Sequence, residues 1–121
     1  TFFVGLYDDS VDAITDSENL SDITTEPNNA NSYARQTEAA SNLTVDTSTA
    51  TISITFPTQT FDVSTNSESV DSYFVGVNFQ SDEESQGSAQ DNLFFTGSLS
   101  QTRDLSQIET LEVDEIGGNQ D

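Results

Sequence analysis

The sequence predicts an all-β fold: a single β-sandwich or jelly-roll-like domain of about eight short antiparallel strands with one short helical turn. Two observations lead to this prediction. Apolar and polar residues alternate in several short runs, which is the period of a half-buried strand. Polar, turn-like segments separate these runs, as in sandwiches and jelly rolls. Because 121 residues is the length of one domain, we assign residues 1–121 to a single β-domain.

The clearest alternation lies in ATISITF, where Ile52, Ile54 and Phe56 face one way before Pro57 ends the strand or places it at an edge. Three later runs have inward faces of the same kind: Tyr73, Val75, Val77 and Phe79 in DSYFVGVNFQ, Leu93, Phe95 and Leu99 in NLFFTGSL, and Leu111 and Val113 in TLEVDEI. We therefore expect a buried core made of these sets: Phe2 or Phe3, Ile52, Ile54, Phe56, Tyr73, Val75, Val77, Phe95, Leu111 and Val113.

Four further segments complete the strands: FFVGLY at the start, SYARQT, LTV at 43–45 and TFDV at 60–63. The segment DSENLSDI instead predicts a helical turn, because Leu20 and Ile23 are three residues apart and Asp16 or Ser17 can cap it. The long polar segment Ser81–Asn92 predicts an exposed, mobile hairpin loop.

The charge of the chain is very one-sided. It has 22 Asp and Glu against two arginines and no lysine, for a net charge of −20. Self-repulsion of this kind destabilises a compact state, but the Debye length falls from ~10 Å at 0.1 M salt to ~3 Å at 1 M. Since the acids are spread along the chain, we expect a protein built for very high salt. An ordinary acidic surface and a flexible acidic linker are the alternatives.

Several function classes lack the residues that they need. Histidine and cysteine are absent, and with them the commonest bases, nucleophiles and transition-metal ligands. No serine lies in a G-x-S-x-G elbow, and the acidic pairs match no calcium loop. We expect a protein that is not an enzyme, with no catalytic, cofactor-binding or metal-binding residues. Phosphate binding needs clustered cations and a membrane helix needs ~20 apolar residues, so we expect neither nucleic acid nor a membrane as partner.

The arginine of SYARQT is one of only two basic residues, Arg35 and Arg103. On a strand, Tyr33 and Arg35 would share one face. Either Tyr33 packs in the core while Arg35 pairs with a local carboxylate, or Arg35 anchors an acidic neighbouring subunit through its planar fork. We take Tyr33, Arg35, Arg103 and Phe94 as interface candidates. The acid-poor stretches Ala50–Phe61 and Leu93–Arg103 are the expected interface segments.

The order of short phrases along the chain resembles a known family. FFVGLYDD, SDITTE, SYARQT, ATISITF, SYFVGV, NLFFTGSLSQTRDL and ETLEVD follow one another over nearly the whole length. This order is similar to small virion proteins of tailed double-stranded DNA viruses, and with the saline composition it looks like an accessory structural protein of a haloarchaeal virus.

The resemblance implies an assembly role without a reaction: capsid decoration, turret or fibre-base component on the virion exterior. Its partners would be the major capsid protein or other virion proteins, and the chain would form a homo-oligomer. A small domain without a catalytic set offers mainly surface, which symmetry multiplies into many contacts. The alternative function is a haloarchaeal surface or secreted β-sandwich module that binds a glycan, which would need exposed aromatic residues on one face.

Overall fold

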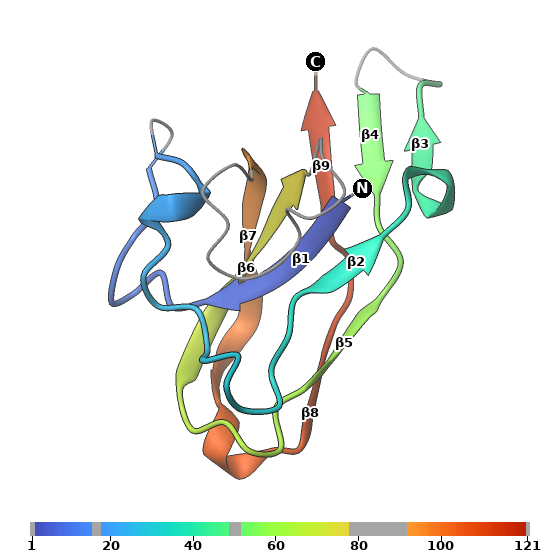
Figure 1. Cartoon of the computed structure of the whole chain (residues 1–121). Coiled ribbons are helices and arrows are strands. Elements are labelled where there is room, and N and C mark those ends of the chain that lie inside the picture. The colour runs from blue at the N-terminus through green and yellow to red at the C-terminus, as the bar shows by residue number, and fades with distance from the viewer. Residues whose placement is uncertain (1, 16–17, 49–51, 78–91, 121) are drawn as a thin grey trace.

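The computed structural model describes residues 2–15, 18–48, 52–77 and 92–120, with the backbone alone for 118–120 (Figure 1). The all-β prediction is confirmed: the described residues form antiparallel strands and single 3₁₀ turns, without an α-helix. The strands are β1 (Phe2–Tyr7), β2 (Gln36–Glu38), β3 (Thr44–Asp46), β4 (Ile52–Thr55), β5 (Gln59–Asp62), β6 (Ser69–Val77), β7 (Asn92–Asp104), β8 (Thr110–Val113) and β9 (Gly117–Gln120). The 3₁₀ turns are η1 (Leu20–Asp22), η2 (Ala40–Asn42) and η3 (Leu105–Gln107).

The first layer is a four-stranded sheet in the order β2-β1-β6-β7. Its centre is made by two copies of the tripeptide Phe-Val-Gly, one in β1 and one in β6. Because the strands are antiparallel, Phe3 pairs with Gly76, Val4 with Val75, and Gly5 with Phe74. A Cβ atom at Gly5 or Gly76 would lie 2.2 or 2.3 Å from the opposite ring. Glycine is therefore needed at both positions so that each ring can lie flat on the neighbouring strand.

The second layer is one long antiparallel ladder with a kink in the middle. β4 pairs with β9, and β5 pairs with β8. Phe56 N–H donates to the Ile116 carbonyl between the two halves, at 2.8 Å. The kink coincides with Pro57, which has no N–H to give to a ladder, and with Glu115, whose φ of 56° is left-handed. β3 pairs with the outer half, and the three-stranded sheet β3-β4-β9 projects from one end of the molecule (Figure 1).

The main core lies between the four-stranded sheet and the β5–β8 half of the ladder, which makes a two-layer sandwich. Its buried side chains are Val4, Leu6, Tyr33, Phe56, Phe61, Val63, Val70, Tyr73, Val75, Leu105, Leu111, Val113 and Ile116. A second cluster covers the opposite face of β1 and β6. It consists of Phe3, Tyr7, Phe74 and Leu20, with Leu20 coming from η1. Both faces of the central strand pair are therefore buried, which explains their nearly continuous apolar sequence.

Most of the predicted core is confirmed. Phe3, Phe56, Tyr73, Val75, Leu111 and Val113 are buried, while Phe2, Ile54, Val77 and Phe95 are half-buried. The prediction for Ile52 is wrong, because its side chain is 46% exposed. The segment does form a strand, β4, but the kink after Phe56 directs the start of this strand away from the four-stranded sheet. Phe79 lies outside the described residues.

The other local predictions have mixed outcomes. The helical turn exists as η1, but its N-cap is Asn19, whose side chain and that of Asp22 form a reciprocal capping box. The predicted caps Asp16 and Ser17 lie outside the described residues, as does 81–91 of the expected loop. Of SYARQT only Gln36 and Thr37 are in a strand, whereas β7 extends five residues beyond the predicted NLFFTGSL run, to Asp104. β9 was missed because GGNQ has no apolar pattern.

The two sides of the sandwich differ. On one side, β2 lies against β5, and Gln59 Nε2 donates to Glu38 Oε1 at 3.1 Å. On the other side, β7 and β8 are separated by an open groove of about 510 Å³. One side of the sandwich is therefore closed by side-chain contacts, and the other leaves the edges of β7 and β8 accessible.

Candidate functional site

Arg35 is the centre of a buried polar cluster, which we call the Arg35 cluster: Glu26, Tyr33 and Arg35 with the rings of Phe3 and Phe74. The guanidinium donates from Nε to Glu26 Oε2 and from an Nη to Glu26 Oε1, each at 2.9 Å. Its Cζ lies 5.2 Å from the centroid of each of the two rings. The Arg35 and Glu26 side chains are only 6% and 7% exposed.

The Phe-Val-Gly pairs of the sheet explain why this cluster forms here. Each Phe ring lies over the opposite glycine, and Arg35 Cζ is 5.2 Å from the centroid of both rings. A guanidinium is planar and more weakly hydrated than an ammonium group, so it is better suited to a buried site between aromatic rings. The two-point contact with Glu26 also fits the guanidinium fork. The cluster therefore gives a physical reason for an arginine in a chain without lysine.

Tyr33 connects the Arg35 cluster to the main core. Its ring stacks on Phe61 with centroids 5.9 Å apart, while its hydroxyl donates to Glu26 Oε2 at 2.6 Å and accepts from Leu6 N–H at 3.1 Å. Burial, followed by the negative charge of Glu26, raises the pKa of the Tyr33 hydroxyl well above its ordinary value. The phenol therefore stays protonated and serves as a structural hydrogen-bond donor.

For Arg35 the structure shows the intramolecular alternative, with Tyr33 in the core and Arg35 paired to a local carboxylate. With such low exposure, neither side chain offers surface to another subunit, although both were interface candidates. Sequence reasoning missed Glu26 as the partner. The sequence did hold a signal for Glu26, because SDITTE, which contains it, directly precedes SYARQT among the phrases of the resemblance. A buried arginine beside a core tyrosine also requires an acid nearby.

Arg103, the other arginine, lies on β7 opposite Val70 and is half-buried. It lines the open groove between β7 and β8. Glu112, Asp114 and Glu115 line the same groove. Within the described residues, no carboxylate oxygen lies within 4.0 Å of Arg103, so its charge is exposed to the groove. Arg103 remains a candidate for an anchor to another chain.

Phe94, the fourth candidate, is 44% exposed on β7. Its ring contacts Phe2 and Phe95, with centroid distances of 5.7 and 5.1 Å. It also lines a second, smaller hollow of about 360 Å³ beside Ile14 and Glu18. Phe94 is thus the exposed ring of an aromatic row, and its contacts with Phe2 and Phe95 hold it in place.

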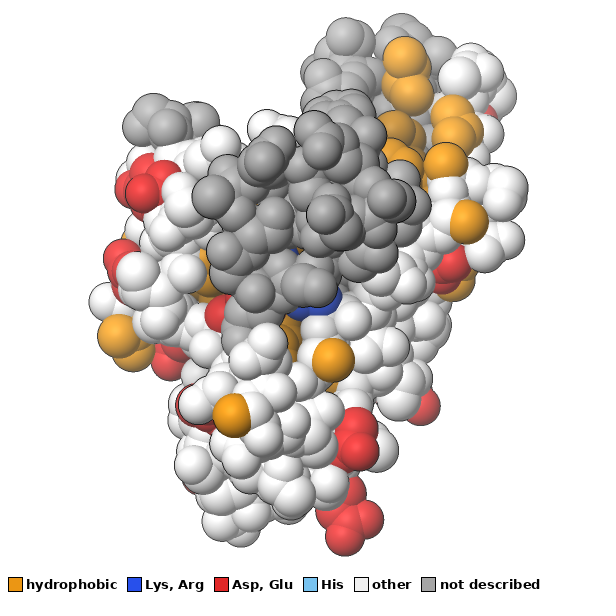
Figure 2. All heavy atoms as spheres, in the orientation of Figure 1, with side chains coloured by type: hydrophobic (Ala, Val, Ile, Leu, Met, Phe, Trp, Pro, Cys, Tyr) orange, Lys and Arg blue, Asp and Glu red, His pale blue; other side chains and the backbone are white. Residues whose placement is uncertain are grey.

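The projecting β3-β4-β9 sheet carries a partly exposed apolar surface, which we call the apolar face: the exposed Val45 and Ile52 and the half-buried Ile54, which also packs against the main core. Val45 pairs directly with Ile54, and Ile52 is two residues from Ile54, so all three point to one side. Val45 is 57% and Ile52 46% exposed. Figure 2 shows hydrophobic side chains gathered over β3 and β4. Sequence reasoning identified the Ile52 stretch through its lack of acids but missed Val45.

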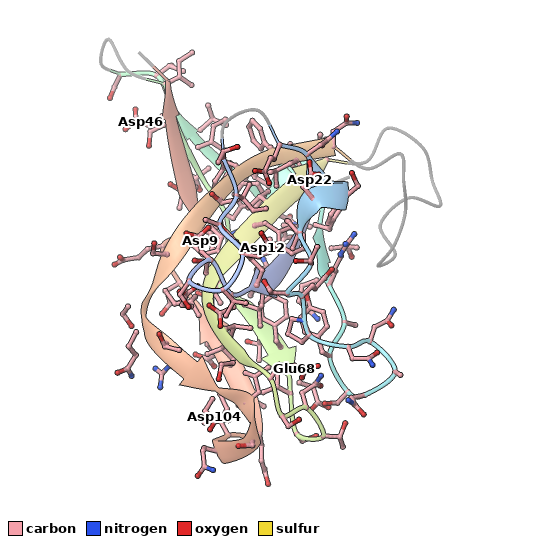
Figure 3. The ribbon with its side chains drawn as sticks, turned by 90° about the vertical axis from the view of Figure 1, so that its left-hand side faces the viewer. Asp9, Asp12, Asp22, Asp46, Glu68 and Asp104 are labelled. Atoms are coloured by element: carbon pink, nitrogen blue, oxygen red, sulfur yellow. The ribbon has the colours of Figure 1, made fainter. Side chains whose placement is uncertain are left out.

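The described acids serve mainly as local caps and surface charges. Asp46, Asp62 and Asp104 each accept a hydrogen bond from the backbone N–H of the serine two residues later. Hydrogen bonds from these serines hold the pKa of each carboxyl below its ordinary value. In Figure 3, Asp46 and Asp104 lie at opposite ends of the molecule, while Asp9 and Asp12 lie in the same turn after β1. In the described ranges, no cluster of three acids fits a metal ion.

No family model, no curated protein and no solved structure matches this chain. Within the described part of the chain, no helix has the length and apolarity of a membrane span.

Proposed function

We propose that this chain is a non-enzymatic structural protein that assembles on the exterior of a halophilic tailed virus, as a capsid decoration or turret component. In this role it contacts the capsid or neighbouring accessory subunits through its apolar face. The observation that carries the proposal is the exposure of Val45 and Ile52 together on a projecting sheet of a chain with net charge −20.

Exposed apolar patches on soluble proteins mark interaction sites when they are contiguous. In molar salt, the cost of leaving apolar surface in water rises for salts that are excluded from the protein surface. A protein with 22 acids has ample polar residues with which to cover a sheet. The apolar face, on neighbouring strands of one sheet, is therefore best explained by a partner that covers it.

The Arg35 cluster supports the resemblance to tailed-virus virion proteins in a limited way. Glu26 comes from SDITTE, and Tyr33 and Arg35 come from SYARQT, which are two of the phrases that carry the resemblance. Their buried hydrogen bonds fit the view that these phrases are structural signatures. The exterior location rests on the resemblance and on the salt-adapted composition.

The experiment that tests the proposal is mass spectrometry of purified virions from a halophilic host that carries this gene. We expect many copies of the chain per particle. Val45→Asp should reduce incorporation, because it places a charge on the apolar face. Thr44→Asp is the matched control, since it adds the same charge on the other face of the same strand.

Absence of the chain from virions would overturn the proposal. Equal incorporation of the Val45→Asp and Thr44→Asp variants would remove the apolar face as the contact surface. A glycan-binding module would instead expose several aromatic rings on one face, whereas among the described aromatic residues Phe94 is the one classed as exposed.

A further inference from the structure

Among the described residues, β7 is a free edge of the four-stranded sheet, because the sheet order ends with it. It has 13 residues, four more than its neighbour β6, and typical strands have ~5–6. An edge strand presents unpaired N–H and C=O groups along its length and is a template for another strand. At the start of β7, Leu93 N–H donates to Asn19 Oδ1 at 3.1 Å. The residues after Leu93 make β7 the longest edge strand among the described residues.

β7 also lacks protective charges and prolines over most of its length, although its pairing with β6 is bulged at two places. Natural edges carry charges, prolines or inward-pointing lysines, but no residue from Asn92 to Thr102 is charged or proline. Over the same residues, 92–102, the exposed side chains are small or hydroxylated, apart from Phe94 and Gln101, and the exposed acid Asp104 lies at the end of the strand. Two register irregularities interrupt the pairing with β6, and between them Phe95–Ser98 pairs regularly. The regularly paired stretch Phe95–Ser98 is therefore the part of β7 that is best suited to add a strand.

The other edges of the described sheets are unsuitable for pairing two copies of a chain with net charge −20. Each of them has only three or four residues. Four carry an acid: Glu38 in β2, Asp46 in β3, Asp62 in β5 and Glu112 in β8. Pairing any of these four with its own copy would bring like charges together, which is unfavourable. The fifth, β9, has no acid but has only four residues. Only β7 offers eleven consecutive uncharged residues, 92–102.

We propose that β7 pairs antiparallel with β7 of a second copy across a two-fold axis, so that the two four-stranded sheets become one continuous sheet. A two-fold interface uses the same surface on both copies, and an antiparallel strand pair satisfies that symmetry. Near the axis, uncharged residues of one copy meet uncharged residues of the other. Arg103 lies toward one end of β7, and the acids of the β8 edge border the contact across the groove.

This pairing rests on the proposed assembly function, for which it names the partner and the mode of contact. It uses a different surface from the apolar face, which stays free for the capsid. It also requires molar salt, since two chains of −20 must approach and the Debye length has to fall to ~3 Å.

Disulfide trapping tests the pairing directly, because the chain has no cysteine. Single cysteines at Thr96, Ser98, Ser100 and Thr102 sample exposed positions along β7. Thr37→Cys is the matched control, exposed on β2 at the opposite edge of the same sheet. In ~1 M salt, where screening is strong, mild oxidation should give covalent dimers with a maximum at one or two neighbouring β7 positions. A two-fold strand pair brings a residue close to its own copy only near the axis.

Sedimentation of the unmodified chain gives a second readout. Ser98→Asp should weaken dimerisation at least about tenfold, because it puts two carboxylates near the axis, whereas Thr37→Asp should leave it unchanged. The pairing is overturned if β7 cysteines cross-link no better than Thr37→Cys, if all β7 positions cross-link equally, or if the chain stays monomeric at ~100 μM. Failed cross-linking with normal virion incorporation overturns the pairing alone. Normal cross-linking of a chain absent from virions overturns the proposed function alone.

Discussion

Replacing Arg35 with methionine should be among the most destabilising single changes in this chain. The change leaves Glu26, which is 7% exposed, as a buried carboxylate without its cation. Removing one partner of a buried ion pair costs about 3–5 kcal/mol, against a total stability of roughly 5–15 kcal/mol for a domain. The loss also includes the stacking of the guanidinium on Phe3 and Phe74.

Urea unfolding followed by circular dichroism in ~1 M salt measures this loss, because urea is uncharged and leaves the screening constant. With an m-value of about 2 kcal/mol/M, a loss of about 4 kcal/mol moves the midpoint down by roughly 2 M. Arg103→Met is the matched control. It removes the other arginine, from an open groove, and should change stability by no more than about 0.5 kcal/mol.

The double variant Arg35→Met/Glu26→Gln separates the lost pair from lost packing. Replacing both charged partners is far less costly than removing one, so the double variant should be more stable than Arg35→Met alone. The reasoning is refuted if Arg35→Met unfolds at the same urea concentration as Arg103→Met. It is also refuted if adding Glu26→Gln destabilises the Arg35→Met variant further, because the unpaired Glu26 carboxylate would then not be the cause of the lost stability.

Four other outcomes follow from the same structure. Phe61→Ala should cost about 3–5 kcal/mol, since the ring is fully buried against Tyr33, whereas Ile52→Ala should be nearly neutral in urea melts of the isolated chain. Gly76→Ala should destabilise by about 1–3 kcal/mol, because its Cβ would lie 2.3 Å from the Phe3 ring; an unchanged melting temperature would contradict this. Dilution from ~1 M to ~0.05 M salt should lower the melting temperature, and a salt-independent melt would remove the argument from screening. The raised pKa of Tyr33 means that the folded state holds the phenol proton more tightly than the unfolded state does. The contribution of this proton to folding stability is therefore complete below pH ~10 and is lost as the pH rises further. In melts at a series of pH values, Tyr33→Phe should reduce the loss of stability at alkaline pH.

The sequence by itself determined the fold class and the strands with a clear alternating pattern. Period-two alternation depends only on which side of a strand each residue faces, so β4, β6, β7 and β8 were identified from local pattern. The absence of histidine, cysteine and lysine was equally visible. Ile52 and Phe94, two of the exposed apolar side chains, fall in the acid-poor stretches that the sequence analysis gives as expected interface segments, which stay a prediction.

Only the tertiary structure decided which faces are covered and which charges are paired. Alternation places Ile52 on the same face as Phe56, but the kink near Pro57 and Glu115 determines that this face leaves the core. The partner of Arg35 is nine residues away in an irregular segment that has no periodicity to reveal it. That β7 is a free edge depends on the order of strands in the sheet. Strand order results from long-range pairing, which local sequence patterns do not encode.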